Sequence, residues 1–191
     1  SSVVQTDQAA LESLLAIHAA EARLIIDVTY SRGTMWRGSR RPATSRLVTM
    51  DIDPECGDIT ADCRALPLRP GVADVLVFDP PHIADGGANG IMHGRYGSHR
   101  GAGLEQVALL FLAEAADTLR PGGLLLCKLA DGVHGGRYHN WGRYYCNAAE
   151  LVGLEQVDCV VRLRRAMNDP KWKRVLHTRR EHVMWYAHVK P

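Results

Sequence analysis

The chain has 191 residues, of which 46% are hydrophobic and 23% are charged, and its 23 Lys and Arg nearly balance its 21 Asp and Glu. These values are ordinary for a globular protein and exclude a disordered chain, a collagen-like chain and a small disulfide scaffold. No apolar run approaches the roughly 20 residues of a membrane span, and no signal-peptide pattern opens the sequence. We therefore expect one intracellular, cytoplasmic domain over residues 1–191 that does not enter a membrane.

The first predicted elements are a helix and a series of buried strands. Thr6 or Asp7 can cap a helix over about residues 8–22, and Leu11, Leu14 and Leu15 fall on one of its faces. Apolar runs of strand length follow at residues 23–28, 46–52, 73–78 and 123–129. Because these runs are nearly continuous rather than alternating, they predict strands buried on both faces, as in a parallel sheet.

The second half adds a helix over about residues 104–119, which Pro121 and two glycines end. Two later strand-like segments, 154–163 and 181–189, are joined by a polar, basic stretch without a helical apolar pattern. Such a connection suits an antiparallel pair, because a parallel pair needs a covering crossover. The sequence therefore predicts an α/β fold, a mostly parallel sheet with a C-terminal antiparallel hairpin. The short connections between the first strands predict a thin helical layer there.

The cysteines and histidines do not form a ligand pattern. The five cysteines are odd in number, none has CxxC spacing, and the histidines lack HxxxH spacing on a predicted helix. We therefore expect neither a disulfide framework nor a metal site. Cys127 and Cys159 lie in apolar runs and are expected to be small core residues.

Polar residues follow the first two predicted strands at the points where they end. The segment from Asp27 to Gly33 is a small-residue turn, in which Gly33 can adopt a positive φ. Such a turn brings backbone N–H groups to the carboxyl edge of an α/β sheet, where these sheets bind ligands. Asp51 ends the second strand, where a carboxylate can accept both hydroxyl hydrogens of a ribose, and Asp53 is a near alternative. An ordinary turn and a solvated acid are the competing interpretations.

The sharpest pattern is Asp79-Pro80-Pro81-His82, directly after the strand at residues 73–78. Two prolines cannot continue a central strand, and they leave a rigid turn without N–H donors. The Asp79 carboxylate and the Pro80 carbonyl are thereby set as two acceptors, which suits the two hydrogens of an –NH2 group. His82 can then stack on the ring that bears the amine. The competing interpretation is a proline-rich strand exit with a solvent-exposed histidine.

These motifs, in this order, resemble those of the class I S-adenosylmethionine-dependent methyltransferases, and more narrowly those of the DNA amino-methyltransferases. The latter have a cofactor turn of the form D-P-F-x-G-x-G and a catalytic D/N/S-P-P-Y/F/W. Here the turn reads DVTYSRG over residues 27–33, with Ser31 in place of one glycine. The catalytic motif ends in His82 instead of an aromatic hydrocarbon ring.

A closer resemblance is to small methyltransferase-like proteins carried by phages and prophages. They have a similar turn followed by a tryptophan, a VFDPPH stretch and a C-terminal R-x-E-H/W-like strand, here Trp36, residues 77–82 and residues 179–186. The resemblance covers residues 24–190. It implies a Rossmann-like fold, S-adenosyl-L-methionine as the cofactor, and transfer of its methyl group to an amine nitrogen.

The resemblance also implies roles for individual residues, carried over by position. The residues that would bind the cofactor are Asp27, Thr29, Ser31, Gly33, Asp51, Ile52, Asp62, Cys63 and Asp79. Among them Asp51 would take the ribose, and Asp62 and Cys63 would flank the adenine. The residues that would hold the amine and form the catalytic corner are Asp79, Pro80, Pro81 and His82.

A glycine-rich segment at residues 83–103 follows the catalytic motif, and its composition predicts a lid that closes over the substrate. A disordered surface loop is the competing interpretation. The residues expected to contact substrate there are His93, Arg95 and Tyr96. A similar stretch at residues 132–143 is a candidate for the opposite wall of the site.

Basic residues gather in two further parts of the chain. One contains Lys171, Trp172 and Lys173, where cations interleave with an aromatic ring, as suits contact with nucleic acid. The other runs from Arg32 to Arg46 and contains five arginines and no acid. Both favour a phosphate-bearing partner. The competing interpretations are solvated loops and, for Trp172, a ring that covers the end of the core.

The predicted function is an S-adenosylmethionine-dependent N-methyltransferase that acts on a nucleobase amino group, in DNA before other substrates. Carbon methylation of cytosine is disfavoured, because a nucleophilic cysteine would follow the first proline and the sequence there is Pro80-Pro81. One alternative is the same chemistry on RNA, a free nucleoside or a small-molecule amine. Another is a catalytically degenerate module that binds nucleic acid or protein. The chain has no room for a separate target-recognition domain.

Overall fold

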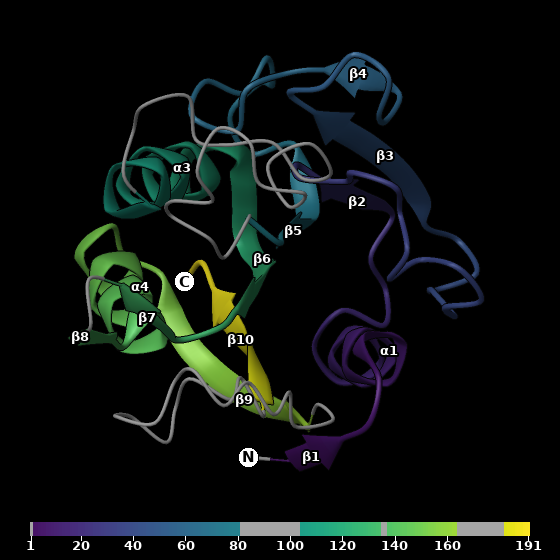
Figure 1. Ribbon diagram of the computed structural model, residues 1–191. Helices are drawn as coiled ribbons and strands as arrows, with labels where there is room; N and C mark the ends of the chain where they lie inside the picture. Colours follow the sequence, from purple (N-terminus) through teal and green to yellow (C-terminus); the bar gives the residue numbers. More distant parts are fainter. Residues whose placement is uncertain (1, 81–103, 135–136, 164–181) are drawn as a thin grey trace.

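The computed structural model describes residues 2–80, 104–134, 137–163 and 182–191, and in this part of the chain eight strands form one sheet (Figure 1). The strands are β1 (Ser2–Val4), β2 (Leu24–Asp27), β3 (Arg46–Asp51), β4 (Ile59–Thr60), β5 (Ala73–Phe78), β6 (Leu119–Leu129), β9 (Glu155–Leu163) and β10 (His182–Val189). Their order across the sheet is β1-β9-β10-β6-β5-β2-β3-β4. A separate pair, β7 (Gly132–His134) and β8 (Arg137–His139), forms a small antiparallel hairpin.

Parallel pairing joins the strands in the middle of the sheet. β5 lies between β2 and β6 and is parallel to both, and β2 continues through β3 to β4 in the same sense. β10 is antiparallel to β6 on one side and to β9 on the other. The predicted α/β fold with a C-terminal antiparallel hairpin is therefore confirmed. The carboxyl ends of β2, β3, β5 and β6 meet at one edge, where such sheets bind ligands.

Helices cover both faces of this sheet (Figure 1). They are α1 (Asp7–His18) on one face and α3 (Leu104–Thr118) and α4 (Trp141–Leu151) on the other. Because successive residues of a strand point to opposite faces, each central strand serves two cores. In β5, Val75 and Val77 pack with α1, whereas Leu76 and Phe78 pack with α3 and α4. The Phe78 ring stacks on Phe111 of α3 with centroids 4.0 Å apart.

The helical layer is thin beside the first strands, as predicted, since residues 28–72 contain no α-helix. α1 supplies the cover on its face, and its Leu11, Leu14 and Leu15 are buried. Thr6 caps this helix, because its Oγ1 accepts the N–H of Ala9 at 3.1 Å.

Two element boundaries differ from the sequence prediction. α1 ends at His18 rather than near residue 22, because Ala19 leaves the helical conformation with φ of −146°. β6 begins at Leu119 rather than at Gly123, because Leu119 already pairs with Ala73 before the register shifts. The Pro-Gly-Gly stretch is therefore an irregularity inside a strand and not the connection that precedes it.

The sequence analysis misses β1 and α4. β1 pairs in parallel with β9 at the edge of the sheet. α4 begins inside the glycine-rich stretch at residues 132–143, where Asn140 caps it by accepting the N–H of Arg143 at 2.7 Å. Position 142 of this helix requires glycine, because a Cβ there would collide with the hydroxyl group of Tyr186. Packing, and not chain flexibility, requires that glycine.

The cysteines expected in the core differ in their burial. Cys127 is buried and its thiol contacts the Tyr145 hydroxyl at 3.1 Å, which confirms its assignment to the core. Cys159 is half-buried and packs against the same cluster.

His188 of β10 is a buried polar residue in an apolar setting. Its side chain is 0% exposed, and neither ring nitrogen has a hydrogen-bond partner among the described residues. The ring instead lies edge-on to Tyr145, with centroids 6.3 Å apart. Burial lowers the pKa of His188 from 6.5 to about 4, because the charged form cannot be solvated there.

His188→Leu is expected to make the fold more resistant to acid. The unfolded chain takes up a proton on His188 below pH 6.5, whereas the folded chain does so only near pH 4. Stability contributed by the neutral ring is therefore lost as the pH falls through that window, by at most about 3 kcal/mol. Urea unfolding of both proteins between pH 4.5 and 7.5 measures the difference. Val189→Leu, which removes no titratable group, should keep the wild-type pH dependence, and equal slopes in all three proteins would contradict the prediction.

Candidate active site

The turn after β2 has a backbone conformation that favours glycine. Ser31 has a φ of 52° and Gly33 a φ of 61°, both in the left-handed region. The N–H of Ser31 donates to Oδ2 of Asp51 at 2.7 Å, which offsets the strain of a residue other than glycine. Gly33 suits this position because its φ lies in the left-handed region, and a Cβ there would also collide with the Tyr30 ring. Ser31 thus takes the place of a glycine without opening the turn.

Asp27, the last residue of β2, is a fully buried carboxyl group that fixes this turn. Its Oδ1 accepts the N–H of Thr29 at 3.0 Å, and its Oδ2 accepts the indole N–H of Trp36 at 2.6 Å. Burial raises the pKa of Asp27 from 3.8 to about 7, and the two hydrogen bonds counter only part of that effect. The carboxyl group is therefore part of the scaffold under the turn and is not exposed to a ligand.

Asp51, at the end of β3, is oriented by two backbone groups. Oδ2 accepts from Ser31 and Oδ1 accepts the N–H of Asp53 at 2.9 Å, so both oxygens are held and each keeps a further lone pair. The alternative acid, Asp53, has its Oδ1 occupied by the N–H of Glu55 at 3.0 Å. Of the two, Asp51 has the oriented carboxylate beside the turn.

Asp79 connects this turn to the end of β5. Its backbone N–H donates to Oγ1 of Thr29 at 2.7 Å, which ties the two strand ends together. Its carboxylate Oδ2 accepts a hydrogen bond from Nζ of Lys128 at 2.6 Å. The charges of Asp79 and Asp51 both add to the rise in the pKa of Asp27. Three carboxyl groups from three strand ends therefore share one electrostatic environment.

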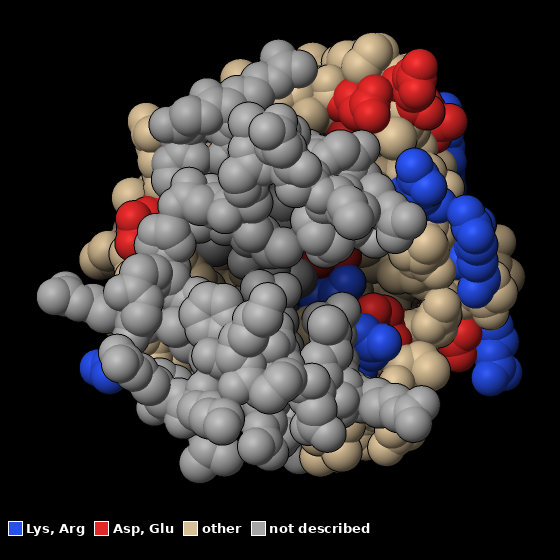
Figure 2. All heavy atoms as spheres, in the orientation of Figure 1, with Lys and Arg blue, Asp and Glu red and all other residues tan. Residues whose placement is uncertain are grey.

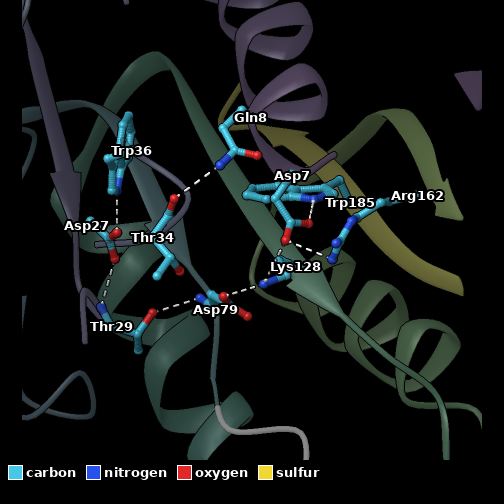
Figure 3. A network of polar contacts seen from close by, with 10 residues as sticks. All are labelled: Asp7, Gln8, Asp27, Thr29, Thr34, Trp36, Asp79, Lys128, Arg162 and Trp185. Atoms are coloured by element: carbon cyan, nitrogen blue, oxygen red, sulfur yellow. Dashed lines mark hydrogen bonds and ion pairs between the residues drawn. The ribbon is translucent and has the colours of Figure 1, made fainter. Parts of the chain in front are cut away.

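Lys128, near the end of β6, lies between two acids (Figure 3). Besides Asp79, its ammonium approaches Oδ2 of Asp7 at 3.5 Å, and its side chain is only 12% exposed. Asp7 begins α1 and is itself held by Arg162 at 2.9 Å and by the indole N–H of Trp185 at 3.2 Å. The result is a row of alternating charges that runs from β5 through β6 and α1 to β9.

The sequence analysis misses this row of charges. In the sequence, Lys128 follows an apolar run and indicates only that a strand is ending, and Asp7 indicates only a helix cap. A charged residue inside an otherwise buried strand is the signal that could have identified Lys128, because a buried ammonium needs a carboxylate partner. The identity of that partner comes only from the fold.

The residues predicted to flank an adenine lie on the other side of the turn. Asp62 follows β4, and the N–H of Ala61 donates to the carbonyl of Asp51 at 2.8 Å, which brings this segment to the same edge. The Asp62 carboxylate pairs with Arg64 at 2.6 Å. Burial and the neighbouring Asp62 raise the pKa of the half-buried Cys63 to about 12, so its thiol stays neutral. Ile52 is exposed beside Asp51.

A small apolar hollow adjoins the Asp79 corner on the α3 and α4 side of the sheet. Pro80 contributes one wall and aromatic rings contribute most of the others; the lining is Phe78, Pro80, Ala108, Leu129, Trp141, Tyr144 and Tyr145. His139 stacks on Trp141 at 5.2 Å and extends this aromatic surface. The first residues of α4, an element that the sequence pattern does not predict, therefore line this hollow.

Several predicted site residues lie outside the described part of the chain. They are Pro81, His82, His93, Arg95, Tyr96, Lys171, Trp172 and Lys173. Within the described ranges, no three His, Cys, Asp or Glu side chains lie close enough to hold a metal ion. No helix in those ranges is long and apolar enough to cross a membrane.

No protein-family model matches the chain, and no curated protein matches its sequence. Solved structures do match its fold. A chain of the Haloferax volcanii complex between the Trm112 methyltransferase activator and a proposed methyltransferase has a TM-score of 0.62 at 16% identity, covering 95% of this chain and 88% of that one. The N-methyltransferase NodS of Bradyrhizobium japonicum has a TM-score of 0.61 at 12% identity, covering 97% and 94%.

A third match carries ligands. The 1,6-didemethyltoxoflavin-N1-methyltransferase of Burkholderia thailandensis, with its substrate and S-adenosylhomocysteine bound, has a TM-score of 0.58 at 13% identity, covering 97% of this chain and 79% of that one. The [4+2]-cyclase SpnF has the same TM-score at 10% identity, covering 95% and 81%. These likenesses confirm the Rossmann-like fold of class I S-adenosylmethionine-dependent methyltransferases. At such low identities they show the fold alone, which also hosts other chemistry.

Asp27→Asn is expected to change how stability depends on pH. The folded protein holds a proton on Asp27 up to pH about 7, whereas the unfolded chain releases it near pH 3.8. The stability linked to that proton is therefore present at low pH and is lost as the pH rises through 7. The variant loses an acceptor for one of two N–H donors at every pH, but it should not lose further stability between pH 5 and 8. Urea unfolding across that range measures this. If the free energy of unfolding of the variant changes with pH in parallel with that of the wild type, the raised pKa of Asp27 is contradicted.

Proposed function

We propose that this protein is an S-adenosylmethionine-dependent N-methyltransferase that acts on an amino group of a nucleobase, in DNA before other substrates. The observation that carries the proposal is the convergence of three features at one sheet edge. They are the left-handed turn at Ser31 and Gly33, the oriented carboxylate of Asp51, and the Asp79-Pro80 corner tied to that turn through Thr29. Two structural neighbours are N-methyltransferases, which supports the same reaction type.

The residues at this edge fit the cofactor. The Asp51 oxygens keep lone pairs that suit the two ribose hydroxyls, and the turn at residues 29–33 brings its backbone close to where the methionine portion would lie. The left-handed φ of 61° at Gly33 gives this turn its tight shape. Asp62, Cys63 and Ile52 lie beside Asp51 and would flank the adenine. When bound, S-adenosylmethionine supplies an electrophilic methyl group on a sulfonium.

Asp79 and Pro80 would hold the amine. One Asp79 oxygen and the Pro80 carbonyl would accept the two amine hydrogens, which turns the nitrogen lone pair toward the methyl group. The Lys128 ammonium donates to Oδ2 of Asp79 at 2.6 Å and so holds that carboxylate in a fixed position. Pro80 and several aromatic side chains lie together beside this corner. The chain therefore needs no covalent intermediate for this reaction.

One alternative is the same methyl transfer to RNA, a free nucleoside or a small-molecule amine. The structural neighbour with bound 1,6-didemethyltoxoflavin, an N-methyltransferase named for that small molecule, supports this alternative. Transfer of labelled methyl to a panel of DNA, RNA, nucleosides and small aromatic amines distinguishes these substrates. A second alternative is a binding module without catalysis; calorimetry that detects no S-adenosylmethionine binding to the intact protein would favour it.

Asp79→Ala and Asp51→Ala are expected to have opposite effects. Asp79→Ala removes an acceptor for the amine and should lower kcat on the order of 100- to 1,000-fold, while the Kd for S-adenosylmethionine stays within a few-fold. Asp51→Ala removes the ribose acceptor and should weaken cofactor binding by about 10-fold or more. Asp79→Asn and Asp51→Asn, which keep one acceptor oxygen, should fall between. Wild-type turnover in Asp79→Ala would refute the catalytic assignment.

Lys128→Met is expected to lower kcat on the order of 100-fold with little change in cofactor Kd, because Asp79 loses the group that positions it. Lys128→Arg keeps the positive charge and should recover part of the activity. Lys190→Met is the matched control. Lys190 is also a partly buried lysine of the C-terminal half, but its Nζ donates to the carbonyl of Leu119 at the opposite edge of the sheet. Equal losses of kcat in Lys128→Met and Lys190→Met would mean that the ion pair between Lys128 and Asp79 contributes to stability and not to catalysis.

A further inference from the structure

The segment between β2 and β3 contains a dense group of exposed arginines. Residues 28–50 include no Asp, Glu or Lys. We call residues 32–46 the arginine loop, and its exposed arginines are Arg32, Arg37, Arg40, Arg41 and Arg46. Figure 2 shows Lys and Arg side chains along one edge of the molecule, over the segment that joins β2 to β3, at the right of the view. Acidic side chains gather instead over β4, at the upper right.

The backbone of the arginine loop is fixed from the inside. The indole of Trp36 donates to buried Asp27 at 2.6 Å, and Met35 is buried in the core under α1. The carbonyl of Thr34 accepts a hydrogen bond from Gln8 at 3.1 Å, and the N–H of Arg40 donates to Glu12 at 2.8 Å. The loop therefore presents its guanidinium groups on an ordered base. A ligand would therefore have to order the arginine side chains but not the backbone that carries them.

The arginine loop begins at the candidate active site. Gly33 belongs to the cofactor turn, and the guanidinium of Arg37 donates to the carbonyl of Arg32 at 3.2 Å, which holds both next to that turn. From there the loop passes along α1 and ends at Arg46, where β3 begins at the opposite edge of the sheet. The arginines thus form a track that starts at the site and leads away from it.

Few of the arginines on this track face a carboxylate within the described part of the chain; besides Arg40, Arg46 lies close enough to Asp58 to lower the pKa of that carboxyl group. Among the described residues, the one arginine of the loop with a carboxylate ion pair is Arg40, whose Nε lies 3.4 Å from Glu12 and whose side chain is 91% exposed. Guanidinium groups bind phosphate oxygens through two parallel hydrogen bonds, and a row of them suits a row of phosphates. A single phosphate could use only one end of such a row, and a free nucleoside, which has no phosphate, could use none of it.

We propose that the arginine loop binds the phosphodiester backbone of a polynucleotide while one base of that strand reaches the Asp79 corner. This inference rests on the proposed function and names the surface that holds its substrate. The backbone would run from the turn at Gly33 along α1, away from the acidic residues over β4. DNA and RNA offer the same phosphate chemistry, so the test includes both.

The test compares two double variants that each remove two exposed guanidinium groups. Arg37→Ala/Arg41→Ala changes the loop, and Arg23→Ala/Arg69→Ala changes exposed arginines that precede β2 and β5 at the opposite edge of the sheet. Fluorescence anisotropy measures binding of labelled single-stranded DNA, double-stranded DNA and RNA 20-mers to the full chain at several salt concentrations. Unlabelled poly-glutamate of equal charge is the competitor, and urea unfolding checks that each variant is folded.

We expect the loop variant to bind its preferred polynucleotide about 10-fold or more weakly, with the slope of log K against log salt reduced by about 2. The control variant should bind as the wild type does, and poly-glutamate should compete poorly. Equal losses in both variants, no wild-type binding at low salt, or competition by poly-glutamate as strong as by DNA would each overturn the proposal. If the protein methylates nucleosides but binds no polynucleotide, the proposal for the arginine loop is refuted and the proposed methyltransferase function is not. Polynucleotide binding through the loop without any methyl transfer would instead refute the proposed function.

Discussion

The arrangement of the candidate site depends on the contact between Lys128 and Asp79. Their 2.6 Å hydrogen bond joins the end of β6 to the corner after β5, and Asp7 extends the contact to α1. Burying an ion pair gains little stability, because desolvation cancels most of the Coulomb attraction. Such a pair instead fixes the positions of its two side chains, because any arrangement that leaves one buried charge without its partner is unfavourable. The row Asp79, Lys128, Asp7 and Arg162 therefore fixes a sheet edge and a helix start relative to each other.

A second constraint is the crowding of carboxyl groups at the same edge. Asp27, Asp51 and Asp79 end three neighbouring strands, and the last two both raise the pKa of the first. The protein reduces this repulsion in different ways at each position. Asp27 is buried with a pKa of about 7, Asp51 accepts two backbone N–H groups, and Asp79 pairs with an ammonium. The three acids therefore differ in their surroundings: Asp27 is buried and supports the turn, whereas Asp51 and Asp79 are half-buried at the edge of the sheet.

The same edge also explains why one fold can support different substrates. In open α/β sheets the strands fix the backbone, whereas the residues after each strand carry the chemistry. The structural neighbours illustrate this, since they include N-methyltransferases and a cyclase. For this chain the distinguishing features are the Asp79-Pro80 corner with its aromatic neighbour surface and the arginine loop that leaves the cofactor turn.

Local sequence patterns were enough to predict the α/β class, the mostly parallel sheet and the antiparallel C-terminal pair. Buried strands and the type of their connections are indicated by apolar runs and by the positions of glycine and proline. The sequence also identified Asp27, Asp51 and Asp79 as strand-end acids. It did not reveal α4, whose Gly142 is required by the distant Tyr186, or the roles of Lys128 and Asp7. Only the tertiary structure decided which of the acids is buried and which ammonium faces Asp79. Those properties depend on residues far apart in the chain, and local patterns carry no information about which of them meet.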